Sequence, residues 1–176
     1  MTVPVETLQY LESIQEINML RYLSGEELEK FLALAEIVYY KKGEKVINLG
    51  DISPHFYAVV KGSMHVSMRE PNGQEVFICT MEQAEVFGES AIFMTEKRTA
   101  DVTSSQDSVL LRVHRKDLMI FIRENPPAGN KILMLIIFSL LSKLREANQE
   151  LAFEKQSVIE LDDIDSLVKD FMEDSD

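Results

Sequence analysis

The sequence predicts an α+β fold in which an antiparallel, jelly-roll-like β-barrel is flanked by N-terminal helices and a long C-terminal helix. Three observations support this fold class. Apolar residues recur at helical spacing before residue 35, short β-rich runs separated by glycines follow, and helical spacing returns after residue 115. We expect a single domain with helical extensions, because 176 residues are enough to bury one substantial core.

The N-terminal segment 1–35 is predicted to be helical. In VETLQYLESIQEI, four apolar residues lie three positions apart, as expected for one face of a helix. These residues are Leu8, Leu11, Ile14 and Ile17. In LSGEELEKFLALAEI, Ser24 is followed three residues later by Glu27, which is the pattern of a capping box. A second helix is therefore expected to begin after Ser24.

The segment 36–115 is predicted to form the barrel. Glycines separate its β-rich runs at intervals of 7 to 12 residues, a spacing typical of antiparallel sandwiches and barrels. The runs are EIVYYKKG, EKVINLG, FYAVVKG, SMHVSMREPNG, QEVFICTM and SVLLRVH. Pro71, Asn72 and Gly73 predict a hairpin turn. Strands of this length that close on themselves favour a jelly-roll-like barrel.

Residues 116–155 are predicted to be helical and to include a dimerisation helix. Apolar residues there follow a 4-3-4-3 spacing, which is typical of a two-stranded coiled coil. The positions are Ile137, Leu141, Leu144, Asn148, Leu151 and Val158, and Lys155 interrupts them. An isolated domain would expose this stripe, so we expect a two-fold homodimer, with packing of the stripe on the barrel as the alternative. Residues 156–176 are expected to be an acidic tail or a short helix.

Composition and charge exclude several classes of protein. The net charge is −12, and nine acidic but two basic residues lie between Glu154 and Asp176, which argues against a nucleic-acid-binding surface. The N-terminus lacks a signal-peptide layout, and the most apolar run, 132–141, is about half as long as a membrane span. We therefore expect a cytoplasmic protein that does not contact membranes. The single cysteine, Cys79, is expected to be a buried apolar residue.

The stretch VFGESAIFMTEKRTADV, residues 86–102, contains the candidate site. Gly88 precedes a carboxylate, Glu89, and Arg98 precedes a hydroxyl, Thr99. Such groups could bind the two ends of one small anion. They could equally form an ordinary loop with a structural or exposed ion pair between Glu89 and Arg98, because surface pairs are common and contribute little.

The order of helices, barrel and long helix, with FGESAIF…KRTADV between the late strands, resembles the cyclic nucleotide-binding domain family over about residues 19–153. The opening of the barrel is also similar, with Gly43-Glu44, Gly50-Asp51 and Gly62 in place. Residues 86–102 look like the phosphate-binding cassette of this family. The chain departs from the family pattern at Lys97, where proline is common, and at Ala84 and Glu85, where Pro-Gly or Gly-Asp is common.

The resemblance implies a ligand site with defined roles. Arg98 would bind the phosphate as a planar fork, backbone N–H groups near Ser90 and Ala91 would add donors, and Glu89 would accept the ribose 2′-hydroxyl. Gly88 would let the backbone approach the ribose, and Thr99 would donate to the phosphate or to the base. The alternative for Thr99 is a plain strand residue without a ligand contact. The predicted ligand-binding residues are Gly88, Glu89, Ser90, Ala91, Arg98, Thr99 and Asn148.

The function implied is a cyclic nucleotide sensor that signals through a ligand-dependent shift of the C-terminal helix. By alignment with the catabolite activator branch, Asn148 would contact the base, but its place on the apolar seam favours dimer specification equally, and plain exposure is the third alternative. The ligand is expected to be cAMP, less readily cGMP, with no other cofactor and an unidentified protein partner. Alternatives are a ligand-free docking or dimerisation module and a co-regulator of transcription that does not bind DNA. No catalytic or metal-binding pattern is found, so we do not expect an enzyme.

Overall fold

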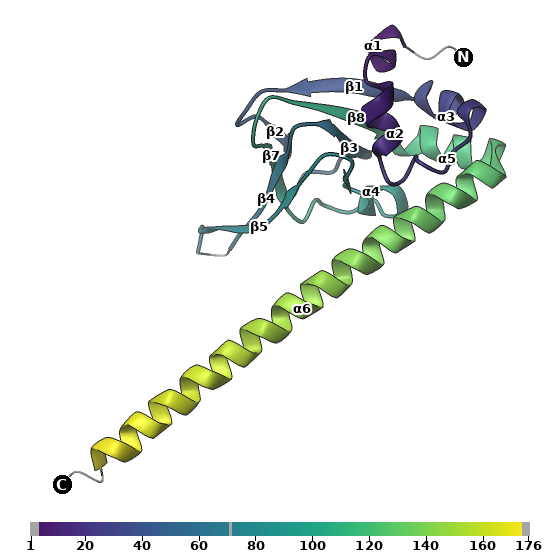
Figure 1. Cartoon of the computed structure of the whole chain (residues 1–176). Coiled ribbons are helices and arrows are strands. Elements are labelled where there is room, and N and C mark those ends of the chain that lie inside the picture. The colour runs from purple at the N-terminus through teal and green to yellow at the C-terminus, as the bar shows by residue number, and fades with distance from the viewer. Residues whose placement is uncertain (1–3, 71, 174–176) are drawn as a thin grey trace. The chain divides into compact units, whose positions relative to one another are not determined.

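The strands between residues 35 and 114 form two four-stranded antiparallel sheets (Figure 1). The computed structural model describes residues 4–70 and 72–173, and for residues 5, 150 and 153–173 only the helical backbone. One sheet has the order β1-β8-β3-β6 and the other β2-β7-β4-β5. The strands are β1 (Ala35–Tyr40), β2 (Lys45–Ile47), β3 (His55–Lys61), β4 (Met64–Arg69), β5 (Glu75–Met81), β6 (Val86–Phe87), β7 (Asp101–Ser104) and β8 (Ser108–His114). The predicted α+β class with antiparallel sheets is confirmed.

The six predicted β-rich runs contain strands β1 to β5 and β8, and two further strands, β6 and β7, lie at the ends of the candidate cassette. The predicted hairpin turn joins β4 to β5, and the amide of Gly73 donates to the carbonyl of Glu70 at 2.9 Å. Pro71, the first residue of that predicted turn, lies outside the described residues. The sequence did not separate β6 and β7 from the cassette, because two and four residues are too few to show a period.

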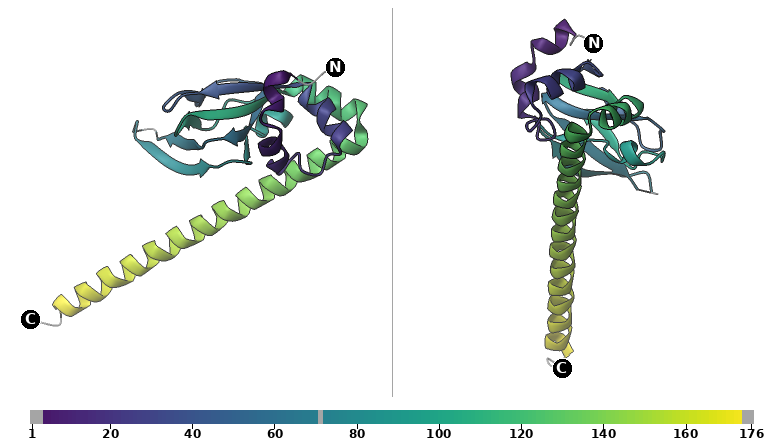
Figure 2. Two further views of the ribbon diagram at one scale, coloured as in Figure 1. Left: turned by 45° about the horizontal axis from the view of Figure 1, so that its top comes forward. Right: turned by 90° about the vertical axis from the view of Figure 1, so that its right-hand side faces the viewer.

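Helices cover one end of the sheets, as the two views in Figure 2 show. The N-terminal helices are α1 (Val5–Leu8), α2 (Leu11–Glu16) and α3 (Gly25–Leu32), and α5 (Arg115–Glu124) contacts α3. The predicted capping box is confirmed, because Ser24 Oγ accepts from the amide of Glu27 and the Glu27 carboxylate accepts from the amide of Ser24. The helical segment expected around Leu8 and Leu11 consists of two short helices.

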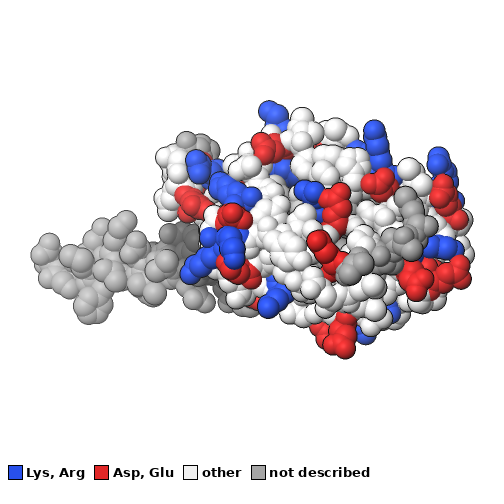
Figure 3. Space-filling view, turned by 90° about the horizontal axis from the view of Figure 1, so that it is seen from above, with Lys and Arg blue, Asp and Glu red and all other residues white. Residues whose placement is uncertain are grey.

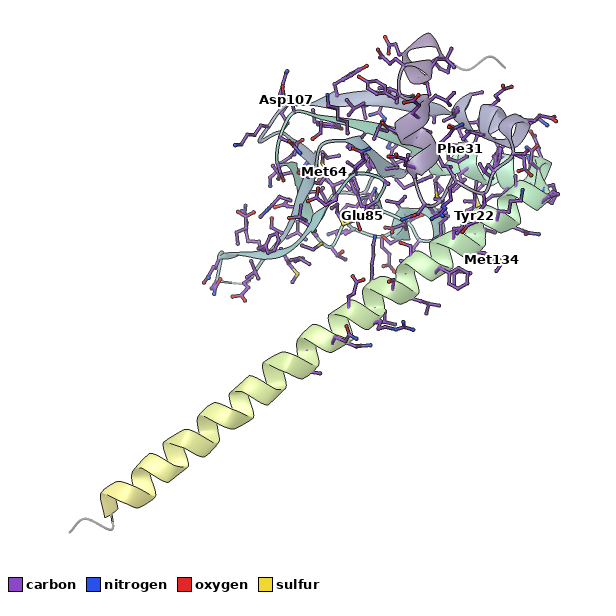
Figure 4. The ribbon with its side chains drawn as sticks, viewed as in Figure 1. Tyr22, Phe31, Met64, Glu85, Asp107 and Met134 are labelled. Carbon is purple, nitrogen blue, oxygen red and sulfur yellow. The ribbon has the colours of Figure 1, made fainter. Side chains whose placement is uncertain are left out.

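Two apolar clusters make up the core. The first lies between the helices and the sheet that contains β3 and β8, and includes Phe31, whose ring meets that of Phe121 edge-on. The second lies between the two sheets and includes Met64 and Leu110 (Figure 4). Ile132 and Ile136, at the start of the last helix, are buried in the first cluster. This first part of the helix therefore packs in the core.

The last helix, α6 (Pro126–Glu173), has 48 residues. It begins directly after Asn125, whose backbone is not helical, because a residue before proline avoids the helical region. The acidic segment expected as a separate tail or short helix is part of α6 up to Glu173. The chain divides into two compact units, one up to Ile136 and one from Ile137 onward.

Within α6, the segment Pro126–Gln149 is long and apolar enough to cross a bilayer by length and composition, with 22% of its most apolar window buried. A core helix of a soluble protein meets the same criterion. The apolar window is longer than the run 132–141 considered from the sequence, because flanking residues of moderate hydropathy extend it. The two buried isoleucines, Ile132 and Ile136, show that this part of the helix serves as a core element.

Ala84, between β5 and β6, is the one described non-glycine residue with a positive φ, at 70°. This conformation costs a non-glycine residue about 1–2 kcal/mol, partly balanced by the lower entropy of the unfolded alanine chain. Ala84→Gly is therefore expected to raise the free energy of unfolding by about 0.5–1 kcal/mol. Urea denaturation measures this change. The control is Ala33→Gly at a φ of −66°, which should lower stability. Destabilisation by Ala84→Gly would contradict the prediction.

Candidate ligand-binding site

The candidate cassette, residues 86–102, connects the two sheets. It leaves β6, turns at Gly88, forms the short helix α4 (Ser90–Phe93) and runs on to Arg98 before β7 begins. Gly88 has a φ of 79°, and a Cβ atom placed there would lie 3.0 Å from Nη1 of Arg98 and 3.4 Å from the carbonyl oxygen of His55. Glycine is therefore required both by the backbone conformation and by the close approach of Arg98.

Arg98 is a buried cation, with 7% of its surface exposed. Its guanidinium donates to the carbonyl oxygens of Gly88 (3.3 Å), Ser53 (3.0 Å) and His55. Among the described residues, its Nε atom has no hydrogen-bond partner. A buried guanidinium with an unsatisfied donor can bind an anion at low cost, because its own desolvation has already occurred on folding.

Burial lowers the pKa of Arg98 below its ordinary value, whereas the neighbouring Tyr57 and Glu89 raise it. The guanidinium still carries its charge at neutral pH, because arginine stays protonated in proteins. Tyr57 belongs to β3, and its ring stacks on that of Phe87 at 5.2 Å. A stacked aromatic pair and a carboxylate thus lie in the surroundings of the cation.

Glu89 is also buried, with 6% of its surface exposed, and it is the residue directly before α4. Its charge acts on Arg98, so the two residues predicted from the sequence are neighbours in the fold. An exposed ion pair is excluded because both side chains are buried, and a structural ion pair stays the alternative. A carboxylate and a guanidinium in one buried region can act on a donor and an acceptor of the same ligand.

The remaining predicted residues differ in their exposure to solvent. Ser90 is exposed at the start of α4, and Ala91 is buried, with its amide donating to the carbonyl of Gly88 at 3.1 Å. The Ala91 N–H is therefore already used within the cassette. Thr99 is exposed at a bend before β7 rather than in a strand. Asn148 is exposed on α6, in the second of the two units, and its role in the site stays a prediction.

The sequence did not indicate how Arg98 is held by the segment between β2 and β3. We call residues 48–54 the 48–54 loop. The amide of Gly50 donates to the carbonyl of Arg98 at 2.8 Å, and the amide of Arg98 donates to the carbonyl of Asp51 at 2.8 Å. Ser53 supplies one of the carbonyls that the guanidinium contacts. These partners are backbone groups, and only Gly50-Asp51 gave a sequence signal.

Asp101 also takes part in this region, although the sequence gave no signal for its role. It is 6% exposed, its Oδ1 accepts from the amide of Leu49 at 2.8 Å, and its Oδ2 lies 2.9 Å from Nζ of Lys45. Burial by itself would raise the pKa of Asp101, but the hydrogen bond from Leu49 and the ion pair with Lys45 hold the pKa below its ordinary value. The residue is therefore an ionised carboxylate at neutral pH.

Two further observations bear on the chemistry of the site. Within the part of the chain that the structure describes, no group of three or more His, Cys, Asp or Glu residues is placed to hold a metal ion.

Arg115, at the start of α5, donates from its side chain to Thr95 Oγ1 at 2.7 Å and from its amide to the carbonyl of Pro54 at 2.8 Å. The cassette and the 48–54 loop are thus both attached to the beginning of α5.

Gly88→Ala is expected to destabilise the protein more than an alanine at an equally left-handed but open position. The φ of 79° costs about 1–2 kcal/mol, and the contact with Arg98 adds about 1 kcal/mol. Gly43→Ala is the matched control, because Gly43 has a φ of 85° and a Cβ added there would meet no atom within 4 Å. If both variants lose the same free energy of unfolding in urea denaturation, the approach of Arg98 imposes no constraint on residue 88.

Comparisons with known proteins show the family and the fold. The family model described as cyclic nucleotide-binding domain matches residues 37–125. The chain is 28% identical to human cGMP-dependent protein kinase 2 over 102 residues, which are 57% of this chain and 13% of the kinase. It is 28% identical to the cyclic AMP receptor protein of Thermus thermophilus over 129 residues, 73% of this chain and 58% of that protein. The chain therefore spans less than two thirds of either relative.

A solved structure shows the same fold. The crystal structure of a cyclic nucleotide-binding domain from Methylobacillus flagellatus superposes with a TM-score of 0.75, covering 81% of this chain and 82% of that chain. The sequence identity is 20%, so this likeness concerns the fold alone.

Proposed function

Because the chain belongs to the cyclic nucleotide-binding domain family, we propose that it binds a cyclic nucleotide in the cassette 86–102 and acts as a sensor rather than an enzyme. The observation that supports this most directly is Arg98, a buried cation whose Nε lacks a hydrogen-bond partner among the described residues. A cyclic nucleotide offers a single phosphate charge, which matches a single buried guanidinium.

The ribose end of the ligand would lie at Glu89 and Gly88. The Glu89 carboxylate would accept the 2′-hydroxyl proton, and the absence of a side chain at Gly88 would let the backbone approach the sugar. Donors near Ser90 and Ala91 would add to phosphate binding. Since the Ala91 amide donates to the Gly88 carbonyl, its use by a ligand would require a rearrangement of this turn.

The base would be recognised by residues other than the buried Glu89 and Arg98. Thr99 is exposed and can donate to the phosphate or to a base, and Asn148 is the polar residue of α6 that we assign to base contact or to dimer pairing. The names of the relatives indicate both bases, since one is a cGMP-dependent kinase and the other a cyclic AMP receptor. We propose cAMP as the preferred ligand and cGMP as the weaker one.

The output would be a ligand-dependent shift of α6 within a cytoplasmic homodimer, read by a protein partner. The stripe on α6 supports the dimer, because Ile137, Leu141, Leu144 and Leu151 are each more than half exposed. Nucleic acid is not the proposed partner. On the face seen in Figure 3, basic and acidic side chains lie next to one another, and the segment from Glu154 onward is strongly acidic.

Calorimetric titration of the protein with cAMP and cGMP, with 5′-AMP as the control, tests the proposal. We expect saturable binding of a cyclic nucleotide and weaker binding of 5′-AMP, whose phosphate is no longer closed on the ribose. If none of the three binds at millimolar concentration, the chain is a ligand-free docking or dimerisation module of this fold.

A further inference from the structure

Asp101 is a buried carboxylate at the beginning of β7, three residues after Arg98 in the sequence. Its two oxygens have different partners. One accepts the amide of Leu49 at 2.8 Å, and the other lies 2.9 Å from the ammonium of Lys45. Both partners belong to the chain that leads from β2 into the 48–54 loop, so a single carboxylate attaches this loop to β7.

The same loop holds Arg98 at three points. The amide of Gly50 donates to the Arg98 carbonyl and the amide of Arg98 donates to the Asp51 carbonyl, each at 2.8 Å. The carbonyl of Ser53 accepts from the guanidinium at 3.0 Å. Leu49, which Asp101 fixes, directly precedes Gly50. Along the loop, the residue that Asp101 binds is therefore followed directly by a residue that binds Arg98.

Strand pairing alone does not hold this part of the loop. The paired positions of β2 and β7 are Lys45 with Thr103 and Ile47 with Val102, and the register shifts between Lys45 and Ile47. Beyond Ile47, the side chain of Asp101 continues the attachment to β7 by accepting the Leu49 amide. A charged acceptor is suited to this place, since hydrogen bonds to an ionised group are stronger than neutral ones.

We propose that Asp101 is a positioning residue for the ligand site, which fixes the 48–54 loop and through it the backbone and guanidinium of Arg98. This inference rests on the proposed function, because the positioning matters for a ligand that Arg98 binds. Asp101 itself does not contact the ligand. Its removal leaves Arg98 and Glu89 in the chain but frees the loop that orients the guanidinium.

The test compares Asp101→Ala with Asp101→Asn. Alanine removes both contacts, and we expect the affinity for the cyclic nucleotide to fall about tenfold. Asparagine keeps an oxygen that can accept the Leu49 amide and loses the ion pair with Lys45, so it is expected to recover most of the affinity. Amide hydrogen exchange, followed by NMR, should become faster at Gly50 and Arg98 in Asp101→Ala and remain nearly as slow as in the unmodified protein in Asp101→Asn.

Asp107→Ala is the control, at a more exposed carboxylate with the same kinds of partner. Asp107, at the turn between β7 and β8, also accepts from a backbone amide, that of Lys42 at 3.1 Å, and pairs with a lysine, Lys41 at 2.7 Å (Figure 4). These two partners precede β2 and lie outside the 48–54 loop, so we expect unchanged affinity and unchanged exchange at Gly50 and Arg98.

Three outcomes would overturn the inference. These are unchanged exchange at Gly50 and Arg98 in Asp101→Ala, equal effects of Asp101→Ala and Asp107→Ala, or an affinity loss in Asp101→Asn as large as in Asp101→Ala. If Asp101→Ala does not fold, Asp101→Asn decides, because the inference requires it to fold with near-normal exchange. If the unmodified protein binds no cyclic nucleotide, the proposed function fails, but the exchange of the two amides still decides whether Asp101 positions Arg98.

Discussion

Replacing Arg98 by alanine is expected to weaken cyclic nucleotide binding roughly a hundred- to several thousandfold. The reason is that the ligand phosphate would be left in a buried region without its cation, and loss of a buried charge partner costs about 3–5 kcal/mol. Arg98→Lys should recover only part of the affinity, because an ammonium cannot reproduce the planar fork of donors. Calorimetry with cAMP and cGMP measures both variants.

The control for this experiment is Lys97→Ala, which removes the exposed positive charge next to Arg98 and should leave binding nearly unchanged. Thermal unfolding must accompany it, because Arg98 also holds the carbonyls of Gly88, Ser53 and His55. Binding of Arg98→Ala within about threefold of the unmodified protein, while the variant is folded, would refute the role assigned to Arg98.

Leu144→Glu is expected to convert a dimer into a monomer. Leu144 is 58% exposed and lies in the middle of the stripe on α6, between Leu141 and Leu151. Burying a leucine contributes about 1.5–3 kcal/mol per chain, and a two-fold axis would also place two carboxylates in the same apolar layer. Sedimentation equilibrium at micromolar protein concentration, with and without cyclic nucleotide, measures the association.

The matched control is Leu140→Glu, the same substitution one residue outside the 4-3-4-3 positions. Charged residues are tolerated beside a coiled-coil seam, so this variant should remain dimeric. If the unmodified protein is monomeric at high micromolar concentration under both conditions, there is no dimer on α6. Equal effects of the two variants would show that association depends on general hydrophobicity and not on the seam.

Local patterns allowed the elements and the centre of the site to be predicted. The capping box at Ser24 and Glu27 is a contact across three residues, and the strands around Gly43 and Gly62 follow from β-rich runs and glycine spacing. Glu89 and Arg98 are close in sequence, so the single stretch 86–102 was enough to propose them as neighbours. The structure places both side chains in a buried region.

What the sequence could not provide depends on contacts between distant residues. From the sequence, Asp101 is an ordinary polar residue in a strand. Its partner Leu49 is 52 positions away, so no local pattern connects the two. The positive φ of Ala84 gave no signal either, because alanine is not the residue that such a turn favours. Tertiary packing determines both features. The division of the first helical segment also had no local signal, since no proline or glycine lies between Leu8 and Leu11.

The three carbonyl oxygens around Arg98 have a thermodynamic consequence for any anion that enters. They accept hydrogen bonds from the guanidinium in the unliganded protein, as water does for an exposed arginine. The affinity for an anion is therefore the difference between the hydrogen bonds of the guanidinium to the anion and those to the carbonyls. A monovalent ion such as chloride exchanges little for these dipoles, whereas a phosphate presents several oxygens to the fork at once. We therefore expect chloride to compete poorly with a phosphate-bearing ligand for Arg98.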